Sequence, residues 1–379
     1  MGGGARIRRW RDYVLLEGGS LSSYWTSRLM TEERDLLLIL GKGFDPRACL
    51  FAENLMGFGG KGKRDCLVLE LDEGPSSPSI EYQETADVNW TRVLQLFEGQ
   101  GTVELRTVKM WDEKQRRIGS RISGALFGNL EPLLAYTDVI IDVSAIPRDI
   151  YFPLVGNIMT LVDAAGTIDG PFRRLNIHIV VAANPSLDRR IVEEGIDAEA
   201  SMIYGFGGGV DREATQNIPR VWIPILGKNQ RPQLQRIREY VKPVETCPAL
   251  PSPSKDPRRG DNLVRDYHDL LFDDFQVDPR NFVYVSERNP FEVYRQIVNV
   301  TDHYQQALRP LGGCKVVVSA SSSKLLSLGA LLVAYELRTD VGVAHVGSQG
   351  FGMLPEGSGG TAERAELFGL WLEGECYET

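Results

Sequence analysis

Hydroxyl-bearing residues and one lysine follow directly on an apolar run at residues 316–318. The polar segment 319–324 then leads into apolar residues with a helical period. This order predicts a buried strand that runs into the N-terminus of a helix. Helix N-termini present unpaired N–H groups and the positive end of the helix dipole, so hydroxyls and an ammonium group there are suited to an anion such as phosphate. We therefore expect ligand contacts from Ser319, Ser321, Ser322, Ser323 and Lys324.

Two further strand-to-helix loops carry small and charged residues. The loop after residues 36–40 has glycines, which let a ligand approach the backbone closely, and basic side chains. The loop after residues 139–143 has a hydroxyl and an arginine. None of the loops has the complete Walker A or dinucleotide-binding pattern. Since ligands of parallel sheets bind where such loops meet, we expect further contacts from Gly41, Lys42, Gly43, Arg47, Ser144 and Arg148.

Candidate general acids and bases are few. Asp142 lies at the end of an apolar run, where a carboxyl group has a raised pKa unless it has a partner. Asp45 lies in the first glycine-containing loop, and His345 lies near the end of the apolar run 341–346. These three are the candidate catalytic residues. His178, inside an apolar run, is expected to be a sheet residue with a hydrogen-bond partner, and no two histidines have the spacing of a metal site.

Composition indicates an ordinary globular protein. The chain has 379 residues, of which 42% are hydrophobic and 25% charged, and a formal net charge of −9. The negative charge argues against binding to bulk nucleic acid. Five cysteines without a Cys-x-x-Cys pair favour a reducing, cytoplasmic location. Because no apolar run approaches the roughly 20 residues of a membrane helix, we expect no membrane association.

Strand-like and helix-like segments alternate along the chain. Such alternation predicts parallel βαβ units, and hence an α/β protein with two Rossmann-like units and mostly parallel, doubly wound sheets. The expected helices include residues 189–194 and 263–272. Prolines are dense at 247–260, which is typical of an extended connection. We therefore expect a larger domain at 1–245 and a smaller one at 246–379.

The C-terminal part, residues 281–348, resembles the Rossmann-like sensor domains of prokaryotic antiviral systems, the CARF and SAVED group. The resembling residues are the strand 316–319, the loop 321–324 and the small-apolar helix 326–336. The resemblance implies binding of an oligonucleotide second messenger at strand-to-helix loops. It also implies a role in antiviral defence.

Phosphate-binding loops outnumber acids, bases and nucleophiles in this sequence. This balance favours a nucleotide-binding or nucleotide-sensing protein that works as an oligomer and with a separately encoded protein partner. No cofactor is expected beyond a nucleotide or another phosphorylated small molecule as ligand. Two alternatives remain: an enzyme acting on a nucleotide or sugar phosphate, and a non-catalytic scaffold for a protein complex. Turnover of the ligand would distinguish the enzyme, and complex formation without a ligand would favour the scaffold.

Overall fold

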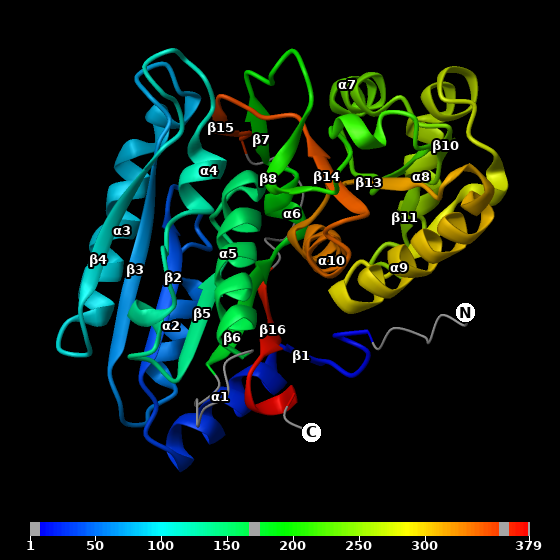
Figure 1. The fold of residues 1–379 in the computed structure, drawn as a ribbon. Helices are drawn as coiled ribbons and strands as arrows, with labels where there is room; N and C mark the ends of the chain where they lie inside the picture. Colours follow the sequence, from blue (N-terminus) through cyan, green and yellow to red (C-terminus); the bar gives the residue numbers. More distant parts are fainter. Residues whose placement is uncertain (1–7, 167–174, 356–363, 378–379) are drawn as a thin grey trace. The chain divides into compact units, whose positions relative to one another are not determined.

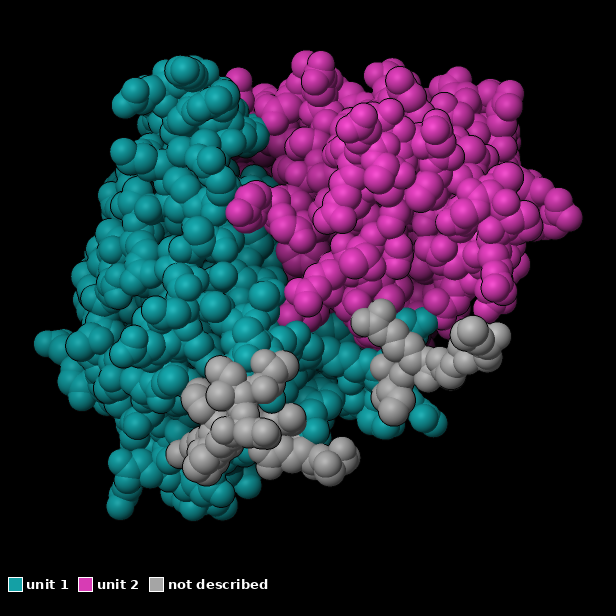
Figure 2. Space-filling view, in the orientation of Figure 1, with its two compact units in different colours: residues 1–184, 358–379 teal, residues 185–357 magenta. Residues whose placement is uncertain are grey.

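The computed structural model of the protein describes residues 8–166, 175–355 and 364–377. The chain forms two compact units, shown in different colours in Figure 2. Unit 1 comprises residues 1–184 and 358–379, and unit 2 comprises residues 185–357. The division after residue 184 differs from the expected one after residue 245. The reason is that the proline-rich segment does not connect two domains but contributes a strand to unit 2.

A seven-stranded sheet lies at the centre of unit 1 (Figure 1). Five neighbouring strands are parallel, and the last two strands at one edge each pair antiparallel with the strand before them. In spatial order the strands are β1 (Val14–Glu17), β16 (Glu366–Glu373), β6 (Asn176–Ala183), β5 (Asp138–Asp142), β2 (Leu36–Lys42), β3 (Arg64–Asp72) and β4 (Val103–Lys109). Every residue of β2 except Lys42 is buried, as in a strand that is covered on both faces.

Helices cover both faces of the unit 1 sheet. Three helices pack their apolar side chains, among them Trp25, Phe51 and Phe97, on one face. The other two contact each other and form the covering of the opposite face (Figure 1). The first three are α1 (Gly19–Thr31), α2 (Leu50–Gly57) and α3 (Gln83–Phe97), and the other two are α4 (Gly119–Ser123) and α5 (Arg148–Gly166). Short 3₁₀ turns are η1 (Pro78–Tyr82), η2 (Glu131–Leu133) and η7 (Glu375–Tyr377).

Unit 2 is built on a five-stranded sheet with one antiparallel edge strand, β8. A parallel bridge between Ile225 and Ala249 joins the strand pair β11–β12 to this sheet. In spatial order the sheet contains β10 (Glu245–Thr246), β9 (Arg220–Pro224), β13 (Lys315–Ser319), β14 (Val341–His345) and β8 (Ser201–Gly207). The other strands are β11 (Ala249–Pro251), β12 (Val283–Val285) and the antiparallel pair β7 (Ile191–Glu194) and β15 (Gly350–Met353).

Helices also cover both faces of the unit 2 sheet. One layer packs against Trp222 and Val317, and the other contains the closely packed helices α9 and α10. A Cβ atom on Gly329 of α10 would lie 2.4 Å from Cβ of Val293 on α9, so this crossing requires glycine. The first layer is α7 (Arg231–Val241), α8 (Arg259–Asp266) and the π-helix η4 (Asp269–Asp274). The remaining elements are α6 (Pro185–Asp188), α9 (Pro290–Ala307), α10 (Lys324–Glu336), η3 (Glu213–Thr215), η5 (Pro279–Asn281) and η6 (Arg309–Leu311).

The predicted α/β class with two Rossmann-like units and mostly parallel sheets is confirmed. One of the expected helices is wrong, and a second is divided. Residues 191–194 form strand β7, because Ile191 and Val192 pair with β15. The helix expected at 263–272 is interrupted, since α8 ends at Asp266 and a π-helix follows. No helix in the described part of the chain is long and apolar enough to cross a membrane.

Both units have the same order of parallel strands. Numbered along the chain within each unit, the order is 3-2-1-4-5: β4-β3-β2-β5-β6 in unit 1, and β12-β10/β11-β9-β13-β14 in unit 2. In such sheets the strand order reverses between strands 1 and 4, and the loops beyond their carboxyl ends diverge to leave a crevice. This point lies between β2 and β5 in unit 1 and between β9 and β13 in unit 2.

Candidate functional site

The loop between β13 and α10 lies at the reversal of strand order in unit 2. Ser319 is 2% exposed and is held at the end of its strand, because its Oγ accepts a hydrogen bond from Trp222 Nε1 at 3.0 Å. Its carbonyl oxygen accepts the N–H of Ile225, which follows β9, at 2.8 Å. Ser319 is therefore a structural link between the two strands, and its predicted ligand contact stays a prediction.

The three serines after this link lie at the N-terminus of α10. Ser323 is the N-cap residue, and its Oγ accepts the N–H of Leu326 at 3.5 Å. Ser322 Oγ is buried and has no hydrogen-bond partner among the described residues. Lys324 is the first residue of the helix, and no acidic residue lies in the first turn. The partial positive charge at the N-terminus of α10 thus has no carboxylate beside it in the first turn of the helix.

Lys42 lies at the matching reversal in unit 1, but its charge is balanced within the protein. Its Nζ is 2.8 Å from Oε1 of Glu70 on β3 and 2.9 Å from Oδ1 of Asp87 on α3. Burial alone would lower the pKa of Lys42, but the hydrogen bonds with these two carboxylates raise it. A ligand phosphate at Lys42 would have to compete with two carboxylates.

Asp45 and Arg47 also pair with each other. Arg47 Nη2 donates to Asp45 Oδ2 at 2.8 Å, and both residues are buried. Asp278 and Arg280, in the other Asp-Pro-Arg segment that forms such a pair, make the same contact on the surface at 2.6 Å. The pairing is therefore a local property of this tripeptide. The roles proposed for Asp45 and Arg47 stay predictions.

Hydrogen bonds tie the loop after β5 to the end of β6. Asp142 is 2% exposed, and its Oδ1 accepts from the backbone N–H of Ser144 at 2.9 Å and from its Oγ at 2.5 Å. Ser144 Oγ in turn accepts the N–H of Ala182 at 2.8 Å, while Ala182 O accepts from Arg47 Nη1 at 3.2 Å. A Cβ atom on Gly41 would lie 3.0 Å from the carbonyl oxygen of Ala145. The structure thus brings five of the predicted site residues to one edge of unit 1: Gly41, Asp45, Arg47, Asp142 and Ser144. Two others lie near them along the chain. Gly43 accepts a hydrogen bond from Asn89, and Arg148 begins α5.

The three candidate catalytic residues fall in different units. Asp45 and Asp142 belong to unit 1, whereas His345 ends β14 of unit 2. His345 Nε2 lies 3.4 Å from Ser201 Oγ on the neighbouring strand β8. In the described part of the chain, no group of three or more His, Cys, Asp or Glu side chains could hold a metal ion. Catalysis by these residues stays a prediction.

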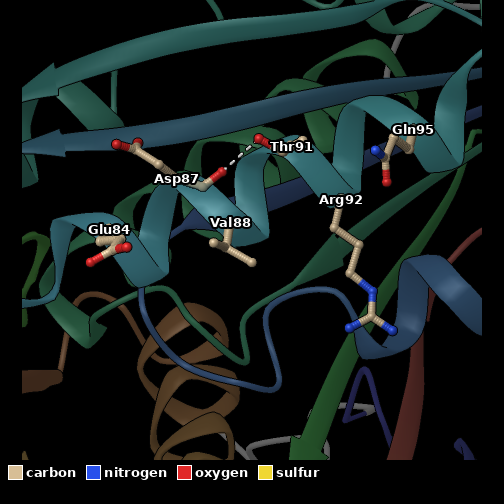
Figure 3. A pocket seen from close by; sticks show the side chains of 6 residues that line it. All are labelled: Glu84, Asp87, Val88, Thr91, Arg92 and Gln95. Atoms are coloured by element: carbon tan, nitrogen blue, oxygen red, sulfur yellow. Dashed lines mark hydrogen bonds between the residues drawn. The ribbon is translucent and has the colours of Figure 1, made fainter.

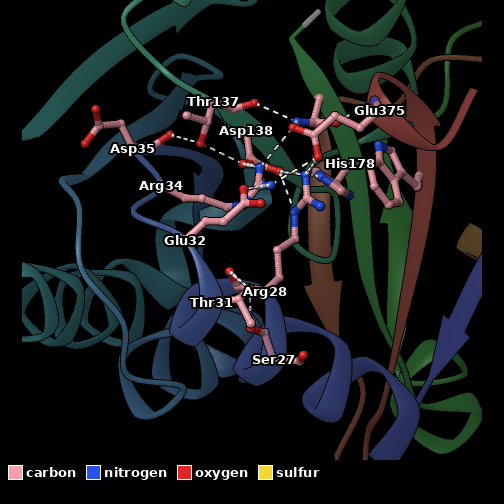
Figure 4. A network of polar contacts seen from close by, with 12 residues as sticks. Ser27, Arg28, Thr31, Glu32, Arg34, Asp35, Thr137, Asp138, His178 and Glu375 are labelled. Carbon is pink, nitrogen blue, oxygen red and sulfur yellow. Dashed lines mark hydrogen bonds and ion pairs between the residues drawn. The ribbon is translucent and has the colours of Figure 1, made fainter. Parts of the chain in front are cut away.

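Sequence reasoning missed a buried ionic network at the opposite, amino-terminal edge of the unit 1 sheet (Figure 4). Asp138, which is fully buried, accepts hydrogen bonds from Arg28 Nη2 at 3.1 Å and Arg34 Nη1 at 3.2 Å. Its Oδ1 also lies 3.0 Å from Nε2 of His178, as expected for a histidine with a partner in the sheet. Glu375 completes the network by accepting from both arginines. The network fixes the segment after β16 to α1 and β5.

Burial and charge act in opposite directions on the acids of this network. Burial alone would raise the pKa of Asp138, but the hydrogen bond from His178 and the charge of Arg28 hold it well below its usual range. Burial likewise opposes ionisation of Glu375, but hydrogen bonds from Arg34 and Asn176 lower its pKa to about 2. Burial lowers the pKa of His178. The network thus joins three carboxylates, those of Asp138, Glu375 and the more exposed Glu32, to two guanidinium groups and an imidazole, and it stabilises the fold.

A shallow open hollow of about 790 Å³ lies along α3 (Figure 3). Its lining residues follow one face of the helix: Glu84, Asp87, Val88, Thr91, Arg92 and Gln95. Asp87 is already paired with Lys42, and Arg92 with Glu53. The lining side chains come from a single helix face, and two of its three charged residues have partners within the protein, so this hollow is not built like a ligand site.

Two short sequence motifs occur in both units. Ile-Leu-Gly-Lys occurs twice, at 39–42, which are the last residues of β2, and at 225–228, which directly follow β9. Val-Ser-Ala also occurs twice, at the end of the fourth parallel strand of each unit. At 143–145 it directly follows β5, and at 318–320 it includes the last two residues of β13. A basic residue then begins the next helix in both units, Arg148 in α5 and Lys324 in α10. The repeat therefore makes Lys228 a further candidate site residue, which sequence reasoning missed.

No family model and no curated protein matches the chain. Among solved structures, a universal stress protein from Archaeoglobus fulgidus DSM 4304 is similar at 12% identity and a TM-score of 0.23, over 83% of this chain and 97% of that one. A NadR protein in complex with NAD and AMP-PNP is similar at 8% identity and a TM-score of 0.25, over 82% of this chain and 90% of that one. Similarities with such low TM-scores carry no argument about this chain's fold or function.

Proposed function

We propose that the protein binds a nucleotide or another phosphorylated small molecule at the carboxyl edge of the unit 2 sheet. The observation that carries this proposal is the position of residues 321–324. They lie where the strand order reverses between β9 and β13, at the N-terminus of a helix without an acidic residue in its first turn. Parallel α/β sheets bind ligands at this point, and helix N-termini favour phosphate.

The side chains around this helix N-terminus are of the types that bind phosphate. Ser322 Oγ is buried without a partner, so a phosphate oxygen would supply a hydrogen bond that the described residues do not. Lys324 would add a positive charge as the first residue of the helix. Unit 1 is the weaker candidate, because Lys42 and Arg47 there are engaged by carboxylates.

Lys324→Ala is expected to weaken nucleotide binding about tenfold, as for the loss of one charge-assisted hydrogen bond of about 1.4 kcal/mol. The measurement is the rise in melting temperature of the full chain with AMP, ADP, ATP and cyclic AMP, since a ligand in excess of its Kd stabilises the folded state. Arg309→Ala is the matched control, because Arg309 is exposed and begins η6, which precedes β13 at the other edge of the sheet. A wild type that none of the four nucleotides stabilises would contradict the proposal.

The finer form of the proposal is a sensor of the CARF and SAVED kind. It would act with a separately encoded protein partner in prokaryotic antiviral defence. Its support is the resemblance of residues 316–336, which form β13, the ligand loop and α10 in unit 2. Mass spectrometry of the nucleotide after binding distinguishes the alternatives. Intact nucleotide supports a sensor, whereas consumed nucleotide supports an enzyme that uses Asp45, Asp142 or His345.

A further inference from the structure

The lysines of the repeated Ile-Leu-Gly-Lys motif have opposite surroundings in the two units. Lys42 in unit 1 is mostly buried and is paired with the carboxylates of Glu70 and Asp87. Lys228 in unit 2 is exposed, and it makes no ion pair with a carboxylate of the described residues. Lys42 is the last residue of β2, whereas Lys228 lies four residues beyond the end of β9, and only Lys42 is paired with carboxylates of the protein.

The loop that carries Lys228 is held in place by buried polar side chains. Tyr267, which is 4% exposed, donates its hydroxyl to the carbonyl oxygen of Gly227 at 2.7 Å and accepts the N–H of Gln230 at 2.9 Å. Gln230 Oε1 in turn accepts the N–H of Gly227 at 3.0 Å. A Cβ atom on Gly227 would lie 2.6 Å from Gln230 Nε2, so a larger residue here would displace the side chain of Gln230. The loop is therefore preorganised, which is a property of binding loops.

This loop begins beside the loop after β13. Ile225 N–H donates to Ser319 O at 2.8 Å, and Leu226 N–H donates to Ala249 O at 3.0 Å. Gly227 and Lys228 are the first residues beyond these ladder contacts. The two loops that flank the reversal of strand order thus start from hydrogen-bonded neighbours, and each carries one lysine, Lys228 or Lys324.

We propose that Lys228 is a second cationic contact of the unit 2 ligand site, where an anionic group of the ligand pairs with its ammonium group. This inference rests on the proposed function. It adds the loop after β9 to a site that so far consists of residues 321–324. It specifies a ligand with more than one anionic oxygen group, such as a nucleoside polyphosphate. In unit 1 the lysine of the same motif, Lys42, is already paired with carboxylates of the protein.

The test combines a variant with chemical labelling of lysines in the full chain. Lys228→Ala is expected to weaken ATP binding about tenfold, and to weaken AMP binding less, with Arg309→Ala as the control for loss of a surface charge. In the wild type without nucleotide, acetic anhydride should modify Lys228 faster than Lys42, since an ion-paired ammonium group is protected. ATP should then slow modification of Lys228.

The outcomes separate this inference from the proposed function. If wild type binds ATP and Lys324→Ala weakens it, but Lys228→Ala does not and ATP leaves Lys228 labelling unchanged, the inference is wrong and the proposed function stands. If acetic anhydride modifies Lys228 as slowly as Lys42 in the absence of nucleotide, Lys228 is not the available lysine that the inference requires, and the inference is wrong. If none of the four nucleotides binds the wild type, both the proposed function and the inference are overturned.

Discussion

Replacing Asp138 by asparagine is expected to lower the free energy of unfolding by about 3–5 kcal/mol, as for the removal of one partner from a buried ion pair. The substitution keeps the size of the side chain but removes the charge that Arg28 and Arg34 share. Arg34 is only 3% exposed, so its guanidinium group cannot regain water without disrupting the fold. Urea denaturation followed by intrinsic tryptophan fluorescence measures the change.

Asp278→Asn is the matched control for this variant. Asp278 also pairs with an arginine, Arg280, but the pair is exposed, and its loss should cost less than about 1 kcal/mol. Equal effects of the two substitutions would show that the Asp138 network does not stabilise the fold.

The wild type should also lose stability in acid. The pKa of His178 is lowered in the folded state, so below about 6.5 the unfolded chain takes up a proton that the folded chain does not. The pKa of Glu375 falls from 4.5 to about 2 on folding, so its contribution is complete above 4.5 and is lost as the pH falls toward 2.

Ser322→Asp is expected to weaken nucleotide binding about 100-fold or more, because a carboxylate would stand where the phosphate is proposed to bind, and like charges at a site cost several kcal/mol. Its effect on folding should be small. A negative charge near the N-terminus of α10 stabilises a helix by about 0.3–1 kcal/mol, which offsets part of any strain from the larger side chain. Titration calorimetry with ATP measures the affinity, and thermal unfolding measures the stability.

Ser322→Asn separates charge from size in this experiment, since asparagine has nearly the same shape as aspartate but no charge. We expect the asparagine variant to keep most of the affinity. If both variants bind ATP as the wild type does, no phosphate lies at Ser322. If both lose binding and stability together, the effect is steric and the assignment of the phosphate to this position is contradicted.

Much of the fold was predictable because the parallel strands are buried on both faces. Runs such as 36–40 and 316–318 are apolar without alternation, and both form central strands. Strand β16 was missed, although Phe368, Leu370 and Leu372 alternate in its sequence, because its pairing with β6 joins segments almost 200 residues apart. The return of residues 366–373 to unit 1 could not be predicted for the same reason, since chain continuity does not show it.

The candidate site was only partly predictable. Strand-to-helix loops could be found from composition, because glycine, serine and lysine follow apolar runs there. Whether a basic side chain is available to a ligand depends on partners that are distant in sequence. Lys42 and Lys228 have identical preceding residues, and only the fold shows that Asp87, from a helix after the next strand, reaches the first of them.

The most direct test of ligand binding in unit 2 is hydrogen exchange of the full chain, with and without the nucleotide that stabilises it most. Binding at the N-terminus of α10 should slow exchange of the backbone amides at 321–327, and those of the loop 227–230 should follow if Lys228 contributes. Slower exchange at these residues would support the account. Protection confined to unit 1, or no protection at 321–327 despite saturating nucleotide, would contradict it.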